Sequence, residues 1–151
     1  MSQMVRDDQS YAIQWEHDLT EMVAVCLNAV TADETVVLRK VYSLLASGPV
    51  PSSAPSPALV DELPGLDNFE SMLTSGAAES AAISLIPAHA GYMLSRGSNG
   101  RHMGSVFMPG LRDEHTAEAS SAALALLAAA LSALHRQTHD HRQLSGADSL
   151  N

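Results

Sequence analysis

Apolar residues recur at intervals of three and four along residues 11–47, which is the spacing of helices that bury one face. Trp15 and Leu19 begin the apolar stripe of the first helix. Thr31 and Glu34 have the spacing of a capping box and predict the start of a second helix. Because the connection between the two helices is short, the pattern predicts an antiparallel helical hairpin.

The middle of the chain is less regular. Residues 48–58 (GPVPSSAPSPA) are rich in proline and serine, which predicts an extended surface linker. Residues 79–90 fit either a helix or a strand. Residues 92–96 and 102–108 flank a turn of glycine, serine and asparagine, so they predict a β-hairpin.

The last predicted element is a long helix rich in alanine and leucine, with Asp113 or Thr116 as its N-cap. Alanines cover most of residues 117–134, so the helix is apolar nearly all round and needs burial on more than one face. It therefore packs either inside its own subunit or against a second copy. Four leucines form a heptad-like seam and are the predicted dimer interface: Leu124, Leu127, Leu131 and Leu134.

Together these elements predict a helix-dominated α+β fold: an N-terminal helical hairpin, a small antiparallel sheet and a long C-terminal helix. An all-α bundle is the alternative, and would follow if residues 79–95 were helical. Residues 1–10 are expected to be a flexible N-terminus, residues 11–139 one globular domain, and residues 140–151 a disordered tail.

Charge and composition narrow the functional classes. The net charge of the 151 residues is −9, and residues 1–80 carry all of the excess acid, so the chain is not expected to bind nucleic acid. The longest apolar run, residues 122–131, is too short to cross a membrane. Cys26 is the single cysteine and lies in an apolar stretch, which favours a buried structural thiol and the cytoplasm.

The turn at residues 95–101 (SRGSNGR) is the candidate ligand site. Its glycines expose backbone N–H groups, and Arg96 and Arg101 flank it beside Asn99, an arrangement that can hold a phosphate or a carboxylate. The pocket would lie between the sheet and the last helix and would be lined by the neighbouring methionines Met93, Met103 and Met108.

Histidines supply two candidate metal sites. His135 and His139 are one helical turn apart and could chelate a transition metal, although the helix is expected to fray there. A second hypothesis combines His17 and Glu21 with residues that no spacing links to them: His89, His102 and His115.

No sequence motif of nucleophilic catalysis or phosphate binding occurs, and the sequence identifies no cofactor. The first hypothesis is therefore a non-enzymatic interaction or regulatory module that self-associates as a homodimer, or binds another protein, through helical surfaces. The second is a small-ligand-binding or sensory domain for an anionic ligand. The third is a metal-dependent enzyme.

Overall fold

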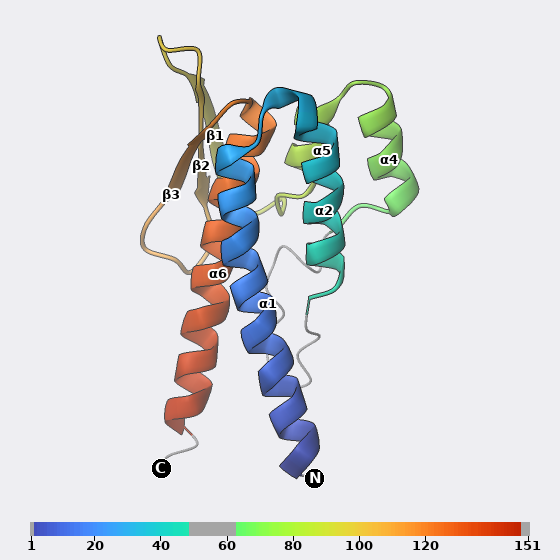
Figure 1. Cartoon of the computed structure of the whole chain (residues 1–151). Coiled ribbons are helices and arrows are strands. Elements are labelled where there is room, and N and C mark those ends of the chain that lie inside the picture. Colours follow the sequence, from blue (N-terminus) through green and yellow to red (C-terminus); the bar gives the residue numbers. More distant parts are fainter. Residues whose placement is uncertain (1, 49–62, 149–151) are drawn as a thin grey trace.

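The computed structural model describes residues 2–48 and 63–148 (Figure 1). The predicted linker therefore lies, apart from Gly48, outside the described residues. In chain order the elements are α1 (Ser2–Asn28), η1 (Thr31–Asp33), α2 (Glu34–Ala46), α4 (Leu66–Thr74), α5 (Ala78–Ser84), β1 (Gly91–Arg96), β2 (His102–Phe107), β3 (His115–Ala119) and α6 (Ala122–Asp148). The predicted helix-dominated α+β class is confirmed, and the all-α alternative is wrong.

Helices α1 and α2 form the predicted hairpin (Figure 1). The indole Nε1 of Trp15 donates to the carbonyl of Leu44 at 2.8 Å, which fixes one helix against the other. The predicted capping box is wrong, because no side chain caps α2. Instead residues 31–33 form a 3-10 turn, and the Thr31 hydroxyl donates to the carbonyl of Ser120 at 3.4 Å.

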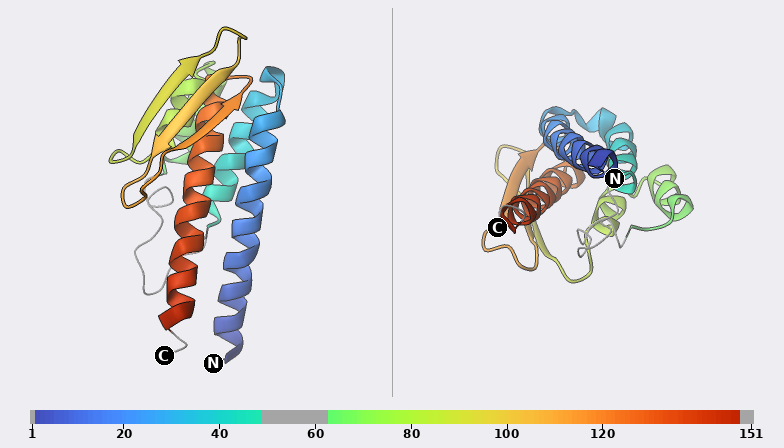
Figure 2. Two further views of the ribbon diagram at one scale, coloured as in Figure 1. Left: turned by 90° about the vertical axis from the view of Figure 1, so that its left-hand side faces the viewer. Right: turned by 90° about the horizontal axis from the view of Figure 1, so that it is seen from below.

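Helix α6 is the centre of the molecule (Figure 2). It packs against α1, against α5 and against the sheet, so its apolar circumference is buried inside its own subunit. The four leucines predicted as a dimer interface are each at most 1% exposed. That interface prediction is wrong, because neighbouring elements of the same chain already cover the seam. The leucines concerned are Leu124, Leu127, Leu131 and Leu134.

Both long helices extend further than the pattern predicted. Helix α1 begins at Ser2 rather than near Tyr11, and α6 continues to Asp148 through residues expected to form a disordered tail. The middle of α1 contacts the C-terminal half of α6, where Glu16 pairs with His139 and Arg142. This contact joins residues far apart in the sequence, so the polar pattern alone does not reveal it.

Of residues 79–90, which the pattern left undecided, the first half is helical, since α5 spans Ala78–Ser84, and residues 85–90 lie in neither helix nor strand. Helices α4 and α5 complete the layer beside α2. Phe69 of α4 is fully buried and stacks on Tyr42 of α2, with ring centroids 4.7 Å apart. Arg39 and Glu70 form an ion pair with N–O distance 3.0 Å at the same contact.

The sheet has three antiparallel strands in the order β1-β2-β3. The predicted strands at 92–96 and 102–108 are confirmed as β1 and β2. The third strand, His115–Ala119, occupies residues that were expected to start the last helix. Asp113 and Thr116 are therefore not its N-cap; the hydroxyl of Ser121 accepts from the N–H of Leu124 at 3.2 Å instead.

The close contact between α6 and the sheet depends on the absence of a side chain at one position of β2. A Cβ atom built on Gly104 of β2 would lie 2.7 Å from the backbone nitrogen of Leu126 and 2.8 Å from the carbonyl carbon of Ala125. The absence of a side chain at Gly104 therefore sets how near the helix lies. None of the helices in the described part of the chain combines the length and apolarity that a membrane crossing requires.

Candidate functional site

The sheet has one covered and one open face. Gly104 and Val106 of β2 face α6 and are buried, so by strand alternation Met103, Ser105 and Phe107 face the other way. Figure 2 shows no described helix over this outer face.

Large apolar side chains are exposed on β1 and β2. Met93, Met103 and Phe107 belong to the outer face, whereas Tyr92 is opposite Val106 and so belongs to the face toward α6, where it is exposed near the β1 edge. The exposed fractions are 41% for Tyr92, 61% for Met93, 43% for Met103 and 41% for Phe107. We call the three outer-face residues Met93, Met103 and Phe107 the exposed sheet surface. Aromatic residues and methionine are the types enriched in protein interfaces, and an exposed cluster of them is typical of a binding surface.

A hydrogen-bonded hydroxyl pair lies at the centre of the outer face. Ser105 is opposite Met93 on one side and Thr116 on the other, and it is only 6% exposed. Its Oγ lies 2.9 Å from the Oγ1 of Thr116, and that hydroxyl donates to Oε1 of Glu114 at 3.1 Å. Because these groups satisfy one another, none is prepared as a nucleophile.

The two edges of the sheet differ. At the β3 edge, the hydroxyl of Ser120 donates to the carbonyl of Ala29 at 2.8 Å, so the end of α1 lies against this side. Strand β1 packs mainly against β2 and α6, and every one of its residues except Leu94 is exposed. Among the described residues, the β1 edge is therefore the open one.

Residues of the predicted anion site line an open hollow, but their charge is partly neutralised. Arg96, Asn99, Arg101 and Met103 line an open hollow of about 250 Å³ together with Glu118. The Nε of Arg101 lies 3.1 Å from Oε1 of Glu118, which also accepts from the amide of Asn99 at 3.3 Å. An entering anion would have to compete with this carboxylate.

The predicted ligand-lining methionines do not lie together. Met93 and Met103 are exposed, whereas Met108 is 3% exposed and belongs to the core. A pocket between the sheet and α6, lined by all three, is wrong because residues that alternate along a strand point to opposite faces. What remains of the ligand prediction is the shallow hollow at the turn.

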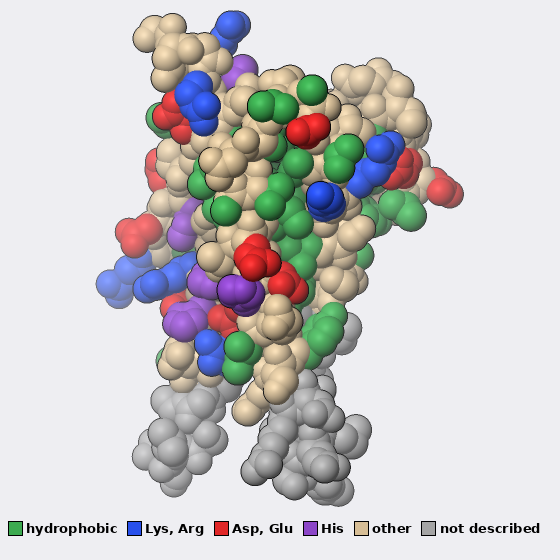
Figure 3. All heavy atoms as spheres, viewed as in Figure 1, with side chains coloured by type: hydrophobic (Ala, Val, Ile, Leu, Met, Phe, Trp, Pro, Cys, Tyr) green, Lys and Arg blue, Asp and Glu red, His purple; other side chains and the backbone are tan. Residues whose placement is uncertain are grey.

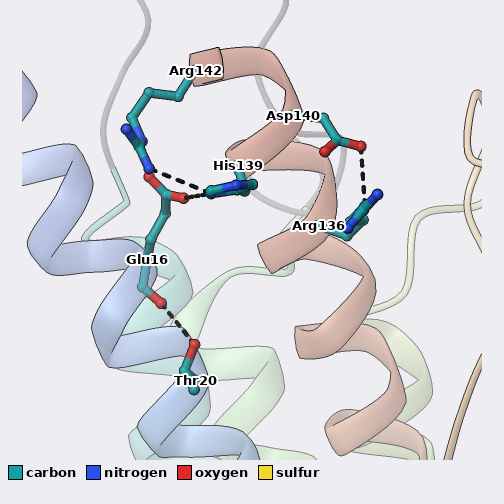
Figure 4. A network of polar contacts seen from close by, with 6 residues as sticks. All are labelled: Glu16, Thr20, Arg136, His139, Asp140 and Arg142. Atoms are coloured by element: carbon teal, nitrogen blue, oxygen red, sulfur yellow. Dashed lines mark hydrogen bonds and ion pairs between the residues drawn. The ribbon is translucent and has the colours of Figure 1, made fainter.

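In the first candidate metal site, His139 contacts an acidic side chain of α1. The rings of His135 and His139 stack with centroids 6.0 Å apart, as their spacing implied. The Nδ1 of His139 lies 3.2 Å from Oε1 of Glu16, and the Nε of Arg142 donates to Oε2 of the same carboxylate (Figure 4). Within the described residues, no group of three or more histidine, cysteine, aspartate or glutamate side chains is placed to hold a metal ion.

The other histidines are not brought together. His17 and Glu21 form an exposed ion pair at 3.1 Å. His102 pairs with Ala119 and His115 with Val106, at opposite ends of the β2–β3 ladder. The described part of the chain therefore does not bring these residues together as the metal-dependent enzyme hypothesis requires.

Sequence reasoning missed the buried carboxylate that joins the two long helices. Glu16 is 4% exposed and receives both Arg142 and His139 of α6 (Figure 4). In Figure 3, acidic, basic and histidine side chains gather where α1 and α6 run side by side. A signal was present, because Glu16 lies three residues before Leu19 and so belongs to the apolar stripe.

Cys26 is buried, as expected. Burial raises the pKa of its thiol to about 12, so the sulfur stays protonated and is a poor nucleophile at neutral pH.

Comparison with models of known families, with curated proteins and with solved structures gave no match to the chain.

Proposed function

We propose that this protein is a non-enzymatic interaction module that self-associates through its sheet. The observation that carries the proposal is the exposed sheet surface, which gathers two methionines and one phenylalanine on β1 and β2, with the exposed Tyr92 on the opposite face of β1. The surface proposed here differs from the helical seam expected from the pattern, since that seam is buried in the subunit's own core.

The charge distribution supports a second copy as the partner. Residues 1–80 carry twelve acidic and three basic side chains, so like copies repel through that half of the chain. Residues 91–119, which contain the sheet, hold three arginines and three acidic residues. Contact through the sheet brings two neutral surfaces together, so like-charge repulsion does not oppose it there.

The hydroxyl and thiol groups of the described residues are consistent with this role. The hydroxyls of Ser105 and Thr116 are satisfied by each other and by Glu114, and the Cys26 thiol is buried. The lone cysteine also supports the cytoplasm as the compartment in which the module acts.

Light scattering of the full chain across a concentration series tests the proposal. We expect the mass to rise from that of the 15.9 kDa chain toward twice that value in the micromolar range. Met93→Lys, which places a charge on the exposed sheet surface, should shift this rise to higher concentration. Val36→Lys is the matched control, because Val36 is an equally accessible apolar residue on α2, 50% exposed. A mass that stays monomeric at every concentration would refute self-association.

A further inference from the structure

The β1 edge has free backbone groups at known positions. The N–H of Gly97 donates to the carbonyl of Arg101 at 2.8 Å, which makes these two residues a hydrogen-bonded pair. From this pair toward the start of β1, hydrogen-bonded and non-hydrogen-bonded pairs alternate without interruption. Met93 and Ser95 therefore direct their N–H and C=O groups toward β2. The N–H and C=O groups of Tyr92, Leu94 and Arg96 consequently point to the open edge.

Nothing in the strand protects this edge. Natural proteins block free strand edges with proline, a bulge, inward-pointing charge or a covering element. β1 contains no proline, its pairing with β2 has no bulge, and its one charged residue, Arg96, is at its end. A free, regular edge of this kind is suited to take on another strand.

We infer that the β1 strands of two copies pair antiparallel about a two-fold axis at Leu94, joining the two sheets into one. This inference rests on the proposed self-association and places the contact at the β1 edge, in one register. Leu94 then faces the partner's Leu94, and Tyr92 faces the partner's Arg96.

The backbone favours this register. It forms hydrogen-bonded pairs at Leu94 and, on each side of it, between Tyr92 and the partner's Arg96, and each such pair exchanges two hydrogen bonds. A register centred on Met93 would use only two such pairs within the strand, each between Tyr92 and the partner's Leu94. The Leu94-centred register therefore satisfies all the outward-pointing groups of β1.

The side chains are complementary in the same register. Tyr92 and Arg96 lie two residues to either side of Leu94, so an antiparallel copy places each opposite the other on one face of the sheet. Tyr92 is 41% exposed, and Arg96 is exposed and forms no ion pair with any other described residue. A guanidinium over a tyrosine ring is a favourable pair, and two-fold symmetry forms it twice. This self-complementarity favours a second copy over an unrelated strand.

Charge exchange at these two positions tests the register in the full chain. Tyr92→Lys places a lysine beside the partner's Arg96 on both sides of the axis, and we expect dimer affinity to fall about tenfold. Adding Arg96→Glu to it should restore the affinity, because the introduced lysine replaces the aromatic ring with a cation that pairs with the new carboxylate. Val36→Lys should leave affinity unchanged.

Tyr92→Pro tests the backbone independently. The N–H of Tyr92 points away from β2, so proline removes no hydrogen bond within the subunit but removes one from each side of the dimer. We expect a native circular dichroism spectrum and dimer affinity weakened by at least about tenfold.

The outcomes separate this inference from the proposed function. A dimer that is indifferent to both Tyr92 substitutions would overturn edge pairing and leave self-association standing. Weakening by Tyr92→Lys without recovery in the double variant would overturn the Leu94-centred register. A chain that remains monomeric yet loses a complex with a different polypeptide on Tyr92→Pro would overturn the second copy as occupant.

Discussion

Replacing Gly104 by alanine should force α6 away from the sheet. The added Cβ would lie 2.7 Å from the backbone nitrogen of Leu126 and 2.8 Å from both the carbonyl carbon of Ala125 and the Cα of Leu126. All of these are main-chain atoms of a fully buried stretch of helix, so no side chain can rotate out of the way. The helix or the strand must shift instead.

The cost follows from these distances. Inserting a methyl group into a tightly packed core typically destabilises by about 1–3 kcal/mol. Alanine is better suited than glycine to an element interior by roughly 0.5–1 kcal/mol, which offsets part of the loss. We therefore expect Gly104→Ala to lower the free energy of unfolding by about 1–2 kcal/mol. For a chain of this length that is a fall of roughly 2–8 °C in Tm.

Gly91→Ala in the neighbouring strand is the matched control. Its Cβ would meet the nearest atoms at 3.6 Å, on the side chain of Phe107, which is ordinary van der Waals contact. We expect no loss of stability there. Urea unfolding of both variants and the native chain at one protein concentration, followed by circular dichroism, measures the difference. Equal stability of Gly104→Ala and Gly91→Ala would refute the packing argument.

Three further outcomes follow from the structure. Arg142→Ala leaves the buried carboxylate of Glu16 without its main donor, so thermal unfolding should show a free energy of unfolding lower by about 1–3 kcal/mol. The control Arg136→Ala breaks an exposed ion pair and should lower it by less than about 1 kcal/mol. Leu131→Ala creates a cavity in α6 and should cost about 2–5 kcal/mol in urea unfolding; a smaller loss would mean that the helix is not central. The Cys26 thiol should resist alkylation in the native chain and react after unfolding.

The raised pKa of Cys26 also sets a direction for stability against pH. The unfolded chain loses the thiol proton near the ordinary cysteine pKa, while the folded chain holds it up to about 12. Between these values the unfolded state binds fewer protons, so this group lowers stability as pH rises through the window. Comparing urea midpoints of the native chain and Cys26→Ala across alkaline pH checks the sign, since the slope should be smaller in the variant.

Local patterns predicted the elements well where one face of an element is buried. The helical hairpin and strands β1 and β2 follow from spacings of three, four and two and from the glycine-rich turn. Gly100, with φ of +82°, provides the left-handed residue that such a turn requires. The register of the hairpin follows from that turn without reference to the rest of the fold.

Patterns failed where a distant segment decides the outcome. Residues 115–119 alternate only weakly, and they form a strand because β2 offers them a free edge. The C-terminal half of α6 looks polar, and its contact with Glu16 of α1 is made only in the folded chain. The partner that stabilises each of these segments lies far away in the sequence.

The sequence by itself determined that the alanine- and leucine-rich helix must be enclosed, because a side-chain pattern that is apolar all round cannot face water. Only the tertiary structure decided what encloses it. The subunit's own sheet and α1 cover the leucine seam, and this leaves the apolar exposure on β1 and β2 instead. Burial depends on which elements pack together in space, and local sequence patterns do not show which distant elements these are.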